Sequence, residues 1–257
     1  MGEADFQTSI TELRQADLLN PRACQLNSFE AHVWEFPIIG SDDLFASCRN
    51  LLAEDERQRA SRFHFEKDSR RFTIARGIVR SILGAYVPLP ARDIRFLCAH
   101  HGKPAIANAA TDLRFNVSHS RDMALLGVAH GREIGVDIEA IRPDVETDKL
   151  AERFFSVQER DTIRSLPPER RVAAFFRCWT SKEAFLKAQG VGLSRSLGSF
   201  DVEVDPEKPA CLLATRPDAL EAGAWRLHEI PTDSGYAAAA AVEGTVDRIK
   251  LLHSNKS

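Results

Sequence analysis

The sequence predicts an α+β protein in which antiparallel strands and long helices occur in two similar blocks. Apolar residues alternate or run together over residues 113–118 and 123–129, on either side of Ser120-Arg121-Asp122, which predicts a β-hairpin. Apolar residues recur at helical spacing over residues 68–86 and 172–189, which predicts two long helices. The elements around these helices follow a loosely repeated order, so we expect the two halves to resemble each other.

The first half begins with a polar, weakly patterned stretch, residues 1–28, which we expect to be a poorly ordered arm. The alternation of residues 32–36 predicts a strand, and residues 42–64 are predicted to be helical. Residues 94–98 predict a short strand ahead of a turn at Gly102-Lys103-Pro104.

The second half opens on an alternating strand at residues 134–139 and has three further predicted strands after its long helix. These lie at residues 200–204, 225–230 and 236–242, with a hairpin loop at residues 205–209. No low-complexity linker separates the halves, so we expect one compact body. Its parts are the arm (1–28), the first half (29–133), the second half (134–250) and a tail (251–257).

The composition is that of an ordinary globular protein. With 44% hydrophobic residues, 28% charged residues and a net charge of −3, the chain lacks the basic balance of a nucleic-acid-binding protein. Five cysteines without C-x-x-C spacing argue against a zinc ribbon or a disulfide framework and favour the cytoplasm. The sequence shows neither a signal peptide nor a membrane span.

Basic residues crowd one stretch of the first half. They are Arg57, Arg59, Arg62, Lys67, Arg70, Arg71, Arg76 and Arg80. Two interpretations are equally open from the residues alone: a solvated helix face, or a site for a phosphate or an acidic partner.

Asp137 and Glu139 share one face of the predicted strand at residues 134–139. Residues i and i+2 of a strand point the same way and lie about 6.5–7 Å apart. Two neighbouring carboxylates repel each other unless a cation lies between them. Mg²⁺ prefers oxygen ligands, so this pattern favours a magnesium site.

The predicted helix at residues 172–189 carries charges within its apolar stripe. The stripe consists of Val172, Phe175, Phe176, Trp179 and Leu186. Lys182 and Glu183 fall inside it or at its edge. An unpaired buried charge costs several kcal/mol, so Glu183 needs a cationic partner. A metal ion shared with Asp137 and Glu139 would supply one.

A simpler alternative exists for the same residues. The strand end could lie at the surface, and Glu183 could form an ordinary i,i+4 pair with Lys187, worth about 0.3–0.5 kcal/mol. The simpler alternative suits either segment alone, whereas the two segments together favour a shared site.

These segments resemble motifs of the Sfp-type 4′-phosphopantetheinyl transferases. Gly135-Val136-Asp137-Ile138-Glu139 is similar to their G-[IV]-D-[IV]-E motif, and residues 179–187 are similar to their W-x-x-K-E-[AS]-x-x-K motif. Three shorter stretches follow the family's order: Gly102-Lys103-Pro104, residues 115–120 (FNVSHS) and Gly192-Leu193-Ser194. The resemblance covers roughly residues 51–236.

This resemblance implies a pseudodimer of two similar α+β halves with the active site at their junction. It implies Mg²⁺-dependent transfer of the 4′-phosphopantetheine arm of CoA to a serine of an apo acyl or peptidyl carrier protein, with release of adenosine 3′,5′-bisphosphate. The chain is longer than the short trimeric carrier synthases, so we expect a monomer. Neither a nucleic acid nor a membrane is an expected partner.

The resemblance also implies roles for individual residues. Asp137, Glu139 and Glu183 would bind Mg²⁺, and Glu183 or a water that it orients would take the serine proton. Lys182 and Lys187 would neutralise charge on the transferring phosphate.

A second group of residues is implied in CoA binding. It consists of Arg59, Arg71, Lys103, Ser118, His119 and Lys187, and we expect Arg59 and His119 to hold the 3′-phosphate. The chain departs from the family at Glu56, where relatives often carry a basic residue.

Two other functions fit the same residues. One is a Mg²⁺-dependent pyrophosphohydrolase that cleaves CoA with water, and the other is an inactive relative that binds carrier proteins or CoA. Inactivity would be expected to show as loss of an acid or of a lysine of the pair Lys182 and Lys187, and all of them are present.

Overall fold

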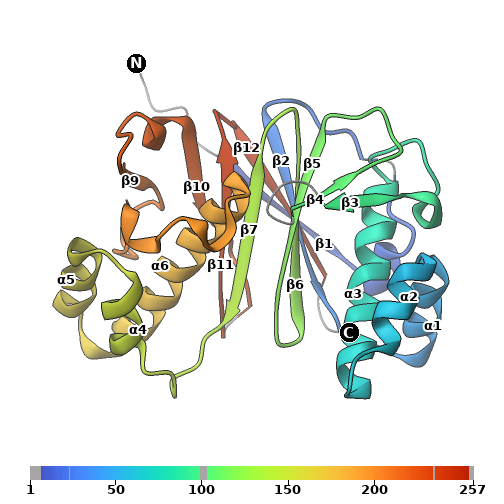
Figure 1. Cartoon of the computed structure of the whole chain (residues 1–257), viewed down its shortest axis with the longest axis horizontal. Coiled ribbons are helices and arrows are strands. Elements are labelled where there is room, and N and C mark those ends of the chain that lie inside the picture. The colour runs from blue at the N-terminus through green and yellow to red at the C-terminus, as the bar shows by residue number, and fades with distance from the viewer. Residues whose placement is uncertain (1–6, 23, 99–102, 234, 255–257) are drawn as a thin grey trace.

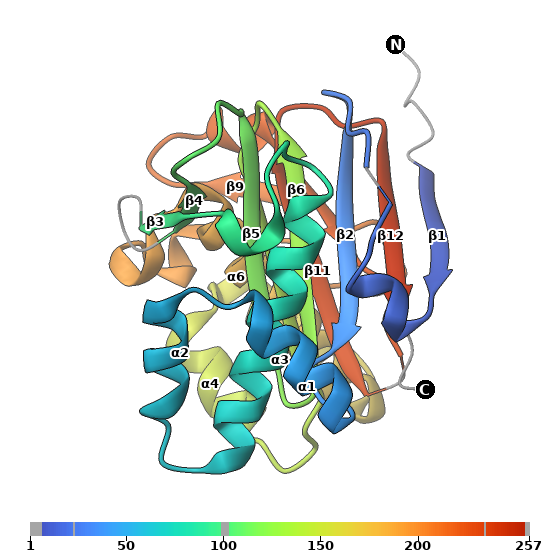
Figure 2. The same cartoon turned by 90° about the vertical axis from the view of Figure 1, so that its right-hand side faces the viewer.

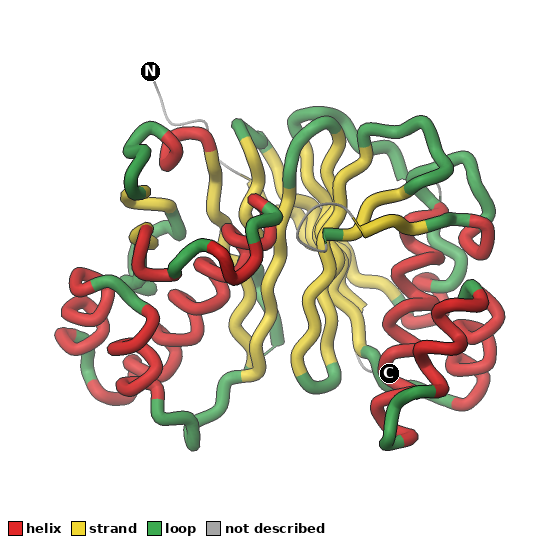
Figure 3. The backbone as a smooth tube through the Cα atoms, viewed as in Figure 1, coloured by secondary structure: helices red, strands yellow, loops and turns green. Residues whose placement is uncertain are grey.

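Two units of helix and strand lie side by side, with their strands between two outer groups of helices (Figure 1; Figure 3). The computed structural model describes residues 7–22, 24–98, 103–233 and 235–254. The α+β class predicted from the sequence is confirmed. Among the described helices, none is long and apolar enough to cross a membrane.

The first unit packs its helices against one face of a sheet. Its helices are α1 (Asp42–Leu51), α2 (Glu54–Ser61) and α3 (Glu66–Gly84). Its strands are β2 (Glu30–Pro37), β3 (Phe96–Cys98), β4 (Pro104–Ile106), β5 (Leu113–Ser120) and β6 (Met123–His130). The predicted hairpin is confirmed as β5–β6, and the predicted helical stretch 42–64 is divided because Leu52 and Ala53 adopt extended backbone angles.

The second unit has the same kinds of element. Its helices are α4 (Thr147–Phe154), α5 (Val157–Ser165) and α6 (Pro168–Gln189). Its strands are β7 (Ile134–Ala140), β8 (Phe200–Val202), β9 (Leu212–Thr215), β10 (Trp225–Glu229) and β11 (Tyr236–Glu243). Helix α6 ends at Gly190, whose φ of 66° is the left-handed conformation that terminates helices.

Short 3₁₀ helices connect these elements. They are η1 (Gln15–Leu18), η2 (Ala91–Asp93), η4 (Gly192–Ser194), η5 (Leu197–Ser199) and η6 (Glu221–Ala224). Of the predicted turn at residues 102–104, Gly102 lies outside the described residues.

The order of the strands confirms the loose repeat. In the first unit the strands lie in the order β2-β6-β5, and in the second in the order β7-β11-β10, with antiparallel pairing throughout. In chain order both units run strand, three helices, two short strands, then two long strands. The chain is therefore a pseudodimer of two similar α+β halves.

The two ends of the chain differ from the predicted arm and tail. Strand β1 (Gln7–Leu13) pairs in parallel with β12 (Arg248–Ser254), which pairs in parallel with β2 (Figure 2). Leu18, in the predicted arm, is fully buried. The predicted tail is wrong for residues 251–254, because β12 fills the edge of β2 and satisfies its backbone groups. A strand that follows the second half thus completes the sheet of the first.

Three apolar cores hold the molecule together. One lies between α3 and the first sheet, a second lies around α6, and a third lies between the two sheets. In the third core Val33 and Leu125 of the first sheet pack with Val136, Ile138 and Ala240 of the second. This core fixes the strand β7 beside the hairpin β5–β6.

Candidate active site

The strands β5 and β7 meet at the junction through side chains. They belong to different sheets, and alternate residues of β5 reach across to β7. The contacts run Arg114 Nε to Glu133 Oε1 (3.1 Å), Val136 N to Asn116 Oδ1 (3.0 Å), Ser118 Oγ to Asp137 Oδ1 (2.8 Å) and Ser120 Oγ to Glu139 Oε2 (2.7 Å). This row of polar contacts links the two halves and fixes both carboxylates of the predicted strand.

Gly135 lets β7 lie directly on α6. A Cβ atom at this position would lie 2.1 Å from the carbonyl oxygen of Ala184 and 2.2 Å from the amide nitrogen of Ala188. These atoms belong to the helix backbone, which cannot move aside without shifting α6. Glycine is therefore required here, and the close approach brings Asp137 to the side of α6 that carries Lys187.

Asp137 is the most deeply buried acid of the site, with 3% of its surface exposed. Its Oδ1 accepts hydrogen bonds from Ser118 and from Lys187 Nζ, the latter at 2.6 Å. Its Oδ2 is buried and has no hydrogen-bond partner. Burial raises the pKa of Asp137 to about 6, against the opposing effect of the Lys187 charge. One carboxylate oxygen is thus held by the protein, and the other remains available.

Glu183 and Glu139 flank this carboxylate and are each half-buried. Burial raises the pKa of Glu183, the positive charge of Lys187 lowers it, and the negative charge of Glu139 raises it further. Glu139 also affects the pKa of Asp137 in the same direction. The structure therefore brings together the three acids that the sequence predicted, with Lys187 among them.

The arrangement of these acids bears on the predicted metal site. Among the residues that the structure describes, no three carboxylate, imidazole or thiol groups converge closely enough to hold a metal ion. The cation that Asp137 contacts is instead the ammonium of Lys187. The residues nevertheless suit a hard cation, because Asp137 Oδ2 is buried without a partner beside two further carboxylates.

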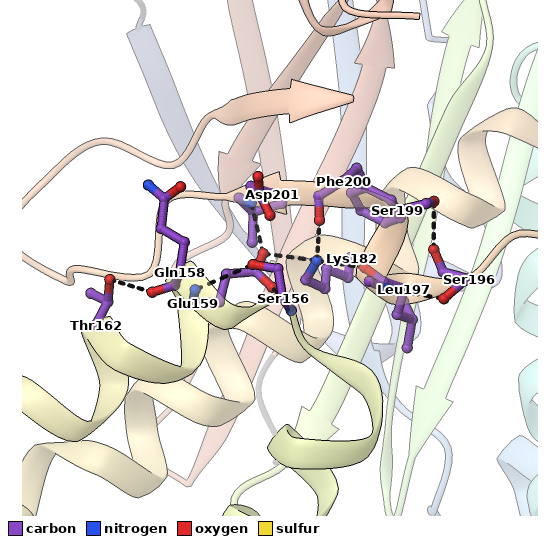
Figure 4. A network of polar contacts seen from close by, with 12 residues as sticks. Ser156, Gln158, Glu159, Thr162, Lys182, Ser196, Leu197, Ser199, Phe200 and Asp201 are labelled. Carbon is purple, nitrogen blue, oxygen red and sulfur yellow. Dashed lines mark hydrogen bonds and ion pairs between the residues drawn. The ribbon is translucent and has the colours of Figure 1, made fainter. Parts of the chain in front are cut away.

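The structure corrects the prediction for Lys182. Its side chain is fully buried in the second half, where its ammonium lies among Glu159, Leu197 and Phe200 (Figure 4). Its Nζ lies 2.8 Å from Glu159 Oε1 and donates to the carbonyl oxygens of Leu197 (2.7 Å) and Phe200 (2.5 Å). Neighbouring helix residues point about 100° apart, so Lys182 and Glu183 face different parts of the protein.

The residues predicted to bind CoA are distributed over the first half. Lys103 Nζ spans the junction, since it donates to Ala188 O (2.8 Å) and pairs with Glu133. Arg71 pairs with Asp122 (2.6 Å) in the β5–β6 turn. Arg59 is exposed on α2, where its guanidinium packs over the Phe72 ring. The structure thus joins Lys103 and Ser118 to the junction and leaves Arg59 apart from it.

His119 lies on the opposite face of β5 from Ser118 and Ser120. It follows Phe115 and Val117, which pack into the core under α3, as predicted from the strand alternation. Loss of hydration and the charge of Lys187 lower the pKa of His119, and Glu139 opposes this shift. The neutral imidazole is therefore favoured near pH 7.

Two glutamates hold elements of the structure together. The sequence singled out Glu56 only as a departure from the family pattern, and it did not single out Glu159. Glu56 accepts hydrogen bonds from Arg76 and, at 2.6 Å, from Arg80, so its carboxylate is used within the first half. Glu159 pairs with Lys182. A signal for Glu159 was present, because Ser156-Val157-Gln158-Glu159 is a capping-box sequence at a helix start.

Two family models and several known proteins match this sequence. The family model described as "4'-phosphopantetheinyl transferase superfamily" matches residues 133–241, and the model "4'-phosphopantetheinyl transferase, N-terminal" matches residues 40–130. The 4'-phosphopantetheinyl transferase HetI of Nostoc sp. is 39% identical over 243 residues, which cover 94% of this chain and 99% of HetI. The 4'-phosphopantetheinyl transferase Sfp of Bacillus subtilis is 32% identical over 155 residues, which cover 60% of this chain and 67% of Sfp.

Solved structures were also compared. The holo-[acyl-carrier-protein] synthase of Thermotoga maritima is 23% identical, with a TM-score of 0.35, over 44% of this chain and 63% of that one. A likeness this low adds nothing to the family assignment, which rests on the matches in sequence.

Proposed function

Because the chain belongs to the 4'-phosphopantetheinyl transferase superfamily, whose members modify carrier proteins, we propose that it takes the phosphopantetheine arm from CoA with the help of Mg²⁺. The acceptor is a serine hydroxyl of an apo acyl or peptidyl carrier protein. The other product is adenosine 3′,5′-bisphosphate.

One observation supports this proposal most directly: the buried carboxylate of Asp137 presents an unpartnered oxygen at the junction of the halves. A buried anionic oxygen without a partner is unfavourable, so the site is suited to a cation. Asp137, Glu139 and Glu183 would hold Mg²⁺, which when bound would neutralise charge on the pyrophosphate of CoA.

Lys187 has a donor left for the substrate. An ammonium group has three N–H donors, and those of Lys187 reach Ser118 Oγ (2.9 Å) and Asp137 Oδ1 (2.6 Å). The remaining donor can bind an oxygen of the transferring phosphate and stabilise its charge. In contrast, all three donors of Lys182 are used within the protein.

Glu183 is the residue that we assign to the serine proton. Its raised pKa makes it a stronger base than an ordinary carboxylate, and it accepts the proton directly or through a water that it orients. The serine oxygen then attacks the phosphorus, and the adenosine bisphosphate leaves with the pyrophosphate bond broken.

The first half would hold the nucleotide. Ser118 and the side chain of Lys103 lie at the junction, and we assign Arg59, Arg71 and His119 to the phosphates, with Arg59 and His119 at the 3′-phosphate. Arg71 would contribute while paired with Asp122. The protein acts as a monomer in the cytoplasm, without nucleic acid or membrane, in this proposal.

The test is mass spectrometry of apo acyl and peptidyl carrier proteins after incubation with CoA and Mg²⁺. We expect the phosphopantetheine mass increment on at least one carrier, and no increment when its acceptor serine is replaced by alanine. Chelation of Mg²⁺ should abolish the increment. The transfer proposal fails if no carrier in a broad panel is modified.

The same incubation distinguishes the two other functions. Cleavage of CoA at an equal rate without any carrier would indicate a pyrophosphohydrolase. Binding of a carrier or CoA without any change in either would indicate an inactive relative.

A further inference from the structure

A buried polar cluster lies in the core of the second half. It includes Lys182 of α6, the helix that also carries Glu183 and Lys187. We define the Lys182 cluster as Lys182, Glu159 and the carbonyl groups of Leu197 and Phe200 (Figure 4). Lys182 is 0% exposed and Glu159 is 1% exposed. The three donors of the ammonium meet three acceptors, so none remains for a substrate.

Glu159 connects this lysine to two further elements. Its Oε2 accepts from the amide of Ser156 (2.9 Å) at the start of α5. Its Oε1, which pairs with Lys182, also accepts from the amide of Val202 (2.8 Å) in β8. The cluster therefore joins α5, α6, the segment after α6 and β8 through hydrogen bonds that are buried or partly buried.

The first half contains the same arrangement at the equivalent place. Glu56 lies in the first turn of α2 and accepts from the amide of Ala53 (2.9 Å). Arg80 of α3 donates to Glu56 (2.6 Å) and to the carbonyl oxygens of Ala91 and Ile94 (2.9 Å each), which follow α3. A short helix, a long helix and the segment after it are joined by one buried ion pair in each half.

The Lys182 cluster holds α6 on one side, through the contacts of Lys182 with Glu159 and with the carbonyl groups of Leu197 and Phe200. On another side of the same helix, Gly135 brings β7 against the backbone of Ala184 and Ala188. Glu183 and Lys187 project between these two points of contact. A change of about 1 Å in the placement of a reacting group can cost about 100-fold in rate. The helix must therefore be held from both sides.

We propose that Glu159 and Lys182 are positioning residues of the transfer reaction: they fix the rotation of α6 and so hold Glu183 and Lys187 against Asp137. Neither residue touches the substrate. The kinetic part of this proposal rests on the proposed function, and its structural part does not.

The experiment compares matched variants of the two buried pairs. Lys182→Met and Glu159→Gln open the pair of the second half, and Arg80→Met opens that of the first. The double variant Glu159→Gln/Lys182→Met removes both charges and leaves no unpaired ion. The melting temperature, kcat and KM are measured for each, well below the lowest melting temperature.

We expect the three single variants to melt at lower temperatures. Lys182→Met and Glu159→Gln each leave a buried group without its ion partner, and Arg80→Met removes the buried partner of Glu56, which keeps its contact with Arg76. Lys182→Met and Glu159→Gln should lower kcat and kcat/KM by a common factor of about 100, which is typical of lost transition-state interactions. Arg80→Met should keep the wild-type kcat. The double variant should regain melting temperature without regaining kcat.

Other results would overturn the proposal. A normal kcat in Glu159→Gln together with a low kcat in Lys182→Met would mean that Lys182 acts on the substrate. Recovery of kcat in the double variant, or an equal loss in Arg80→Met, would mean that the pair contributes stability alone.

Hydrogen exchange supplies a readout that needs no activity. The amides of residues 183–188 should exchange faster in Lys182→Met and Glu159→Gln than in wild type, and at the wild-type rate in Arg80→Met. Unchanged exchange in α6 would refute the positioning role. If wild-type protein modifies no carrier, the transfer proposal fails while this exchange comparison still decides the role of the cluster.

Discussion

The two halves share a fold and a buried ion pair, yet they differ in chemistry. Taking Arg80 and Lys182 as equivalent positions, the residues that follow by one and five places are Ser81 and Ala85 in the first half. In the second half they are Glu183 and Lys187. The ion pair is therefore common to both halves, whereas the acid and the lysine are present only in the second, where β7 lies against α6.

The first strands of the halves show the same difference. Strand β2 carries a buried acid, Glu35, whose Oε2 lies 2.7 Å from His253 Nδ1 of β12. Strand β7 carries Asp137, which faces the junction and contacts Lys187. In the first half the added strand β12 covers the carboxylate. The corresponding region of β7 faces β5, and Asp137 accepts hydrogen bonds from Ser118 of β5 and Lys187 of α6.

The largest effect should come from the acids of the second half. Asp137→Ala and Glu183→Gln should each lower kcat at saturating Mg²⁺ by about 10²–10³ or more, because each removes a carboxylate that would hold the metal ion, and Glu183→Gln also removes the proposed base. Ser81→Ala, the matched change in the first half, should leave kcat unchanged. Circular dichroism checks that each variant folds, and near-normal transfer by either acid variant would remove the metal assignment.

Lys187 provides the next test of the difference between the halves. Lys187→Ala should lower kcat/KM by roughly 30- to 1,000-fold, which is about 2–4 kcal/mol in the transition state. Lys149→Ala is the matched control, since Lys149 forms an exposed pair with Glu146 at 2.7 Å. It should change stability by a few tenths of a kcal/mol and leave kcat/KM unchanged. Unchanged kcat/KM in Lys187→Ala would leave its ion pair with Asp137 as its sole role.

The sequence predicted those parts of the fold in which local pattern and tertiary contacts agree. Helix α6 has an apolar stripe, a proline at its start and a glycine at its end, and β7 alternates cleanly. The hairpin β5–β6 follows from two apolar strands beside a short turn. These elements carry most of the site, which explains why Asp137, Glu183 and Lys187 could be found from the sequence.

The parts that were missed depend on contacts between distant segments. Strands β1 and β12 form because the free edge of β2 accepts them, and nothing local to residues 7–13 specifies that pairing. Lys182 was misassigned because it is adjacent to Glu183 in the sequence, although a helix turns the two side chains apart. The capping role of its partner Glu159 could be recognised from the sequence. The ion pair of Glu159 with Lys182 could not, because it joins two helices and depends on how they pack.

A buried histidine of the first half should make the stability of the protein depend on pH. His32 is 2% exposed, with Nδ1 2.6 Å from the Tyr86 hydroxyl, and burial together with the charge of Lys250 lowers its pKa to about 4. Its folded pKa lies below the ordinary value of 6.5, so protonation favours the unfolded state. Its contribution to stability is therefore complete above about pH 6.5 and is lost as the pH falls toward 4.

The expected loss is roughly 3 kcal/mol, at 1.36 kcal/mol per pKa unit. Urea unfolding at pH 7, 5.5 and 4.5 measures it as the difference between wild type and His32→Gln, which isolates this histidine from the other titrating groups. A difference that stays constant over this range would show that folding does not lower the pKa of His32. Because His32 lies outside the candidate site, the same variant should keep its kcat at pH 7.

The smallest expected effect concerns the contribution of the first half to binding. If Arg59 holds the 3′-phosphate, wild-type protein should bind CoA more tightly than dephospho-CoA, which lacks this group. A charge-assisted contact contributes about 1.5–3 kcal/mol, or roughly 10- to 150-fold. Arg59→Ala should weaken the binding of CoA by this factor and leave the binding of dephospho-CoA almost unchanged. His119→Ala should act in the same direction but mainly at low pH, because the pKa of His119 is lowered.

Arg57→Ala is the matched control on the same helix. The Arg57 guanidinium is already tied to the Leu52 carbonyl (2.6 Å) and to Glu54 (3.1 Å), so its removal should affect both nucleotides equally and weakly. The measurement is Kd for CoA and dephospho-CoA with each protein. Equal weakening of both ligands by Arg59→Ala would place the 3′-phosphate elsewhere, and Arg71 and Lys103 would be the next residues to test. A selective loss would instead mean that the halves divide the work, because the first would hold the nucleotide while the second carries out the transfer.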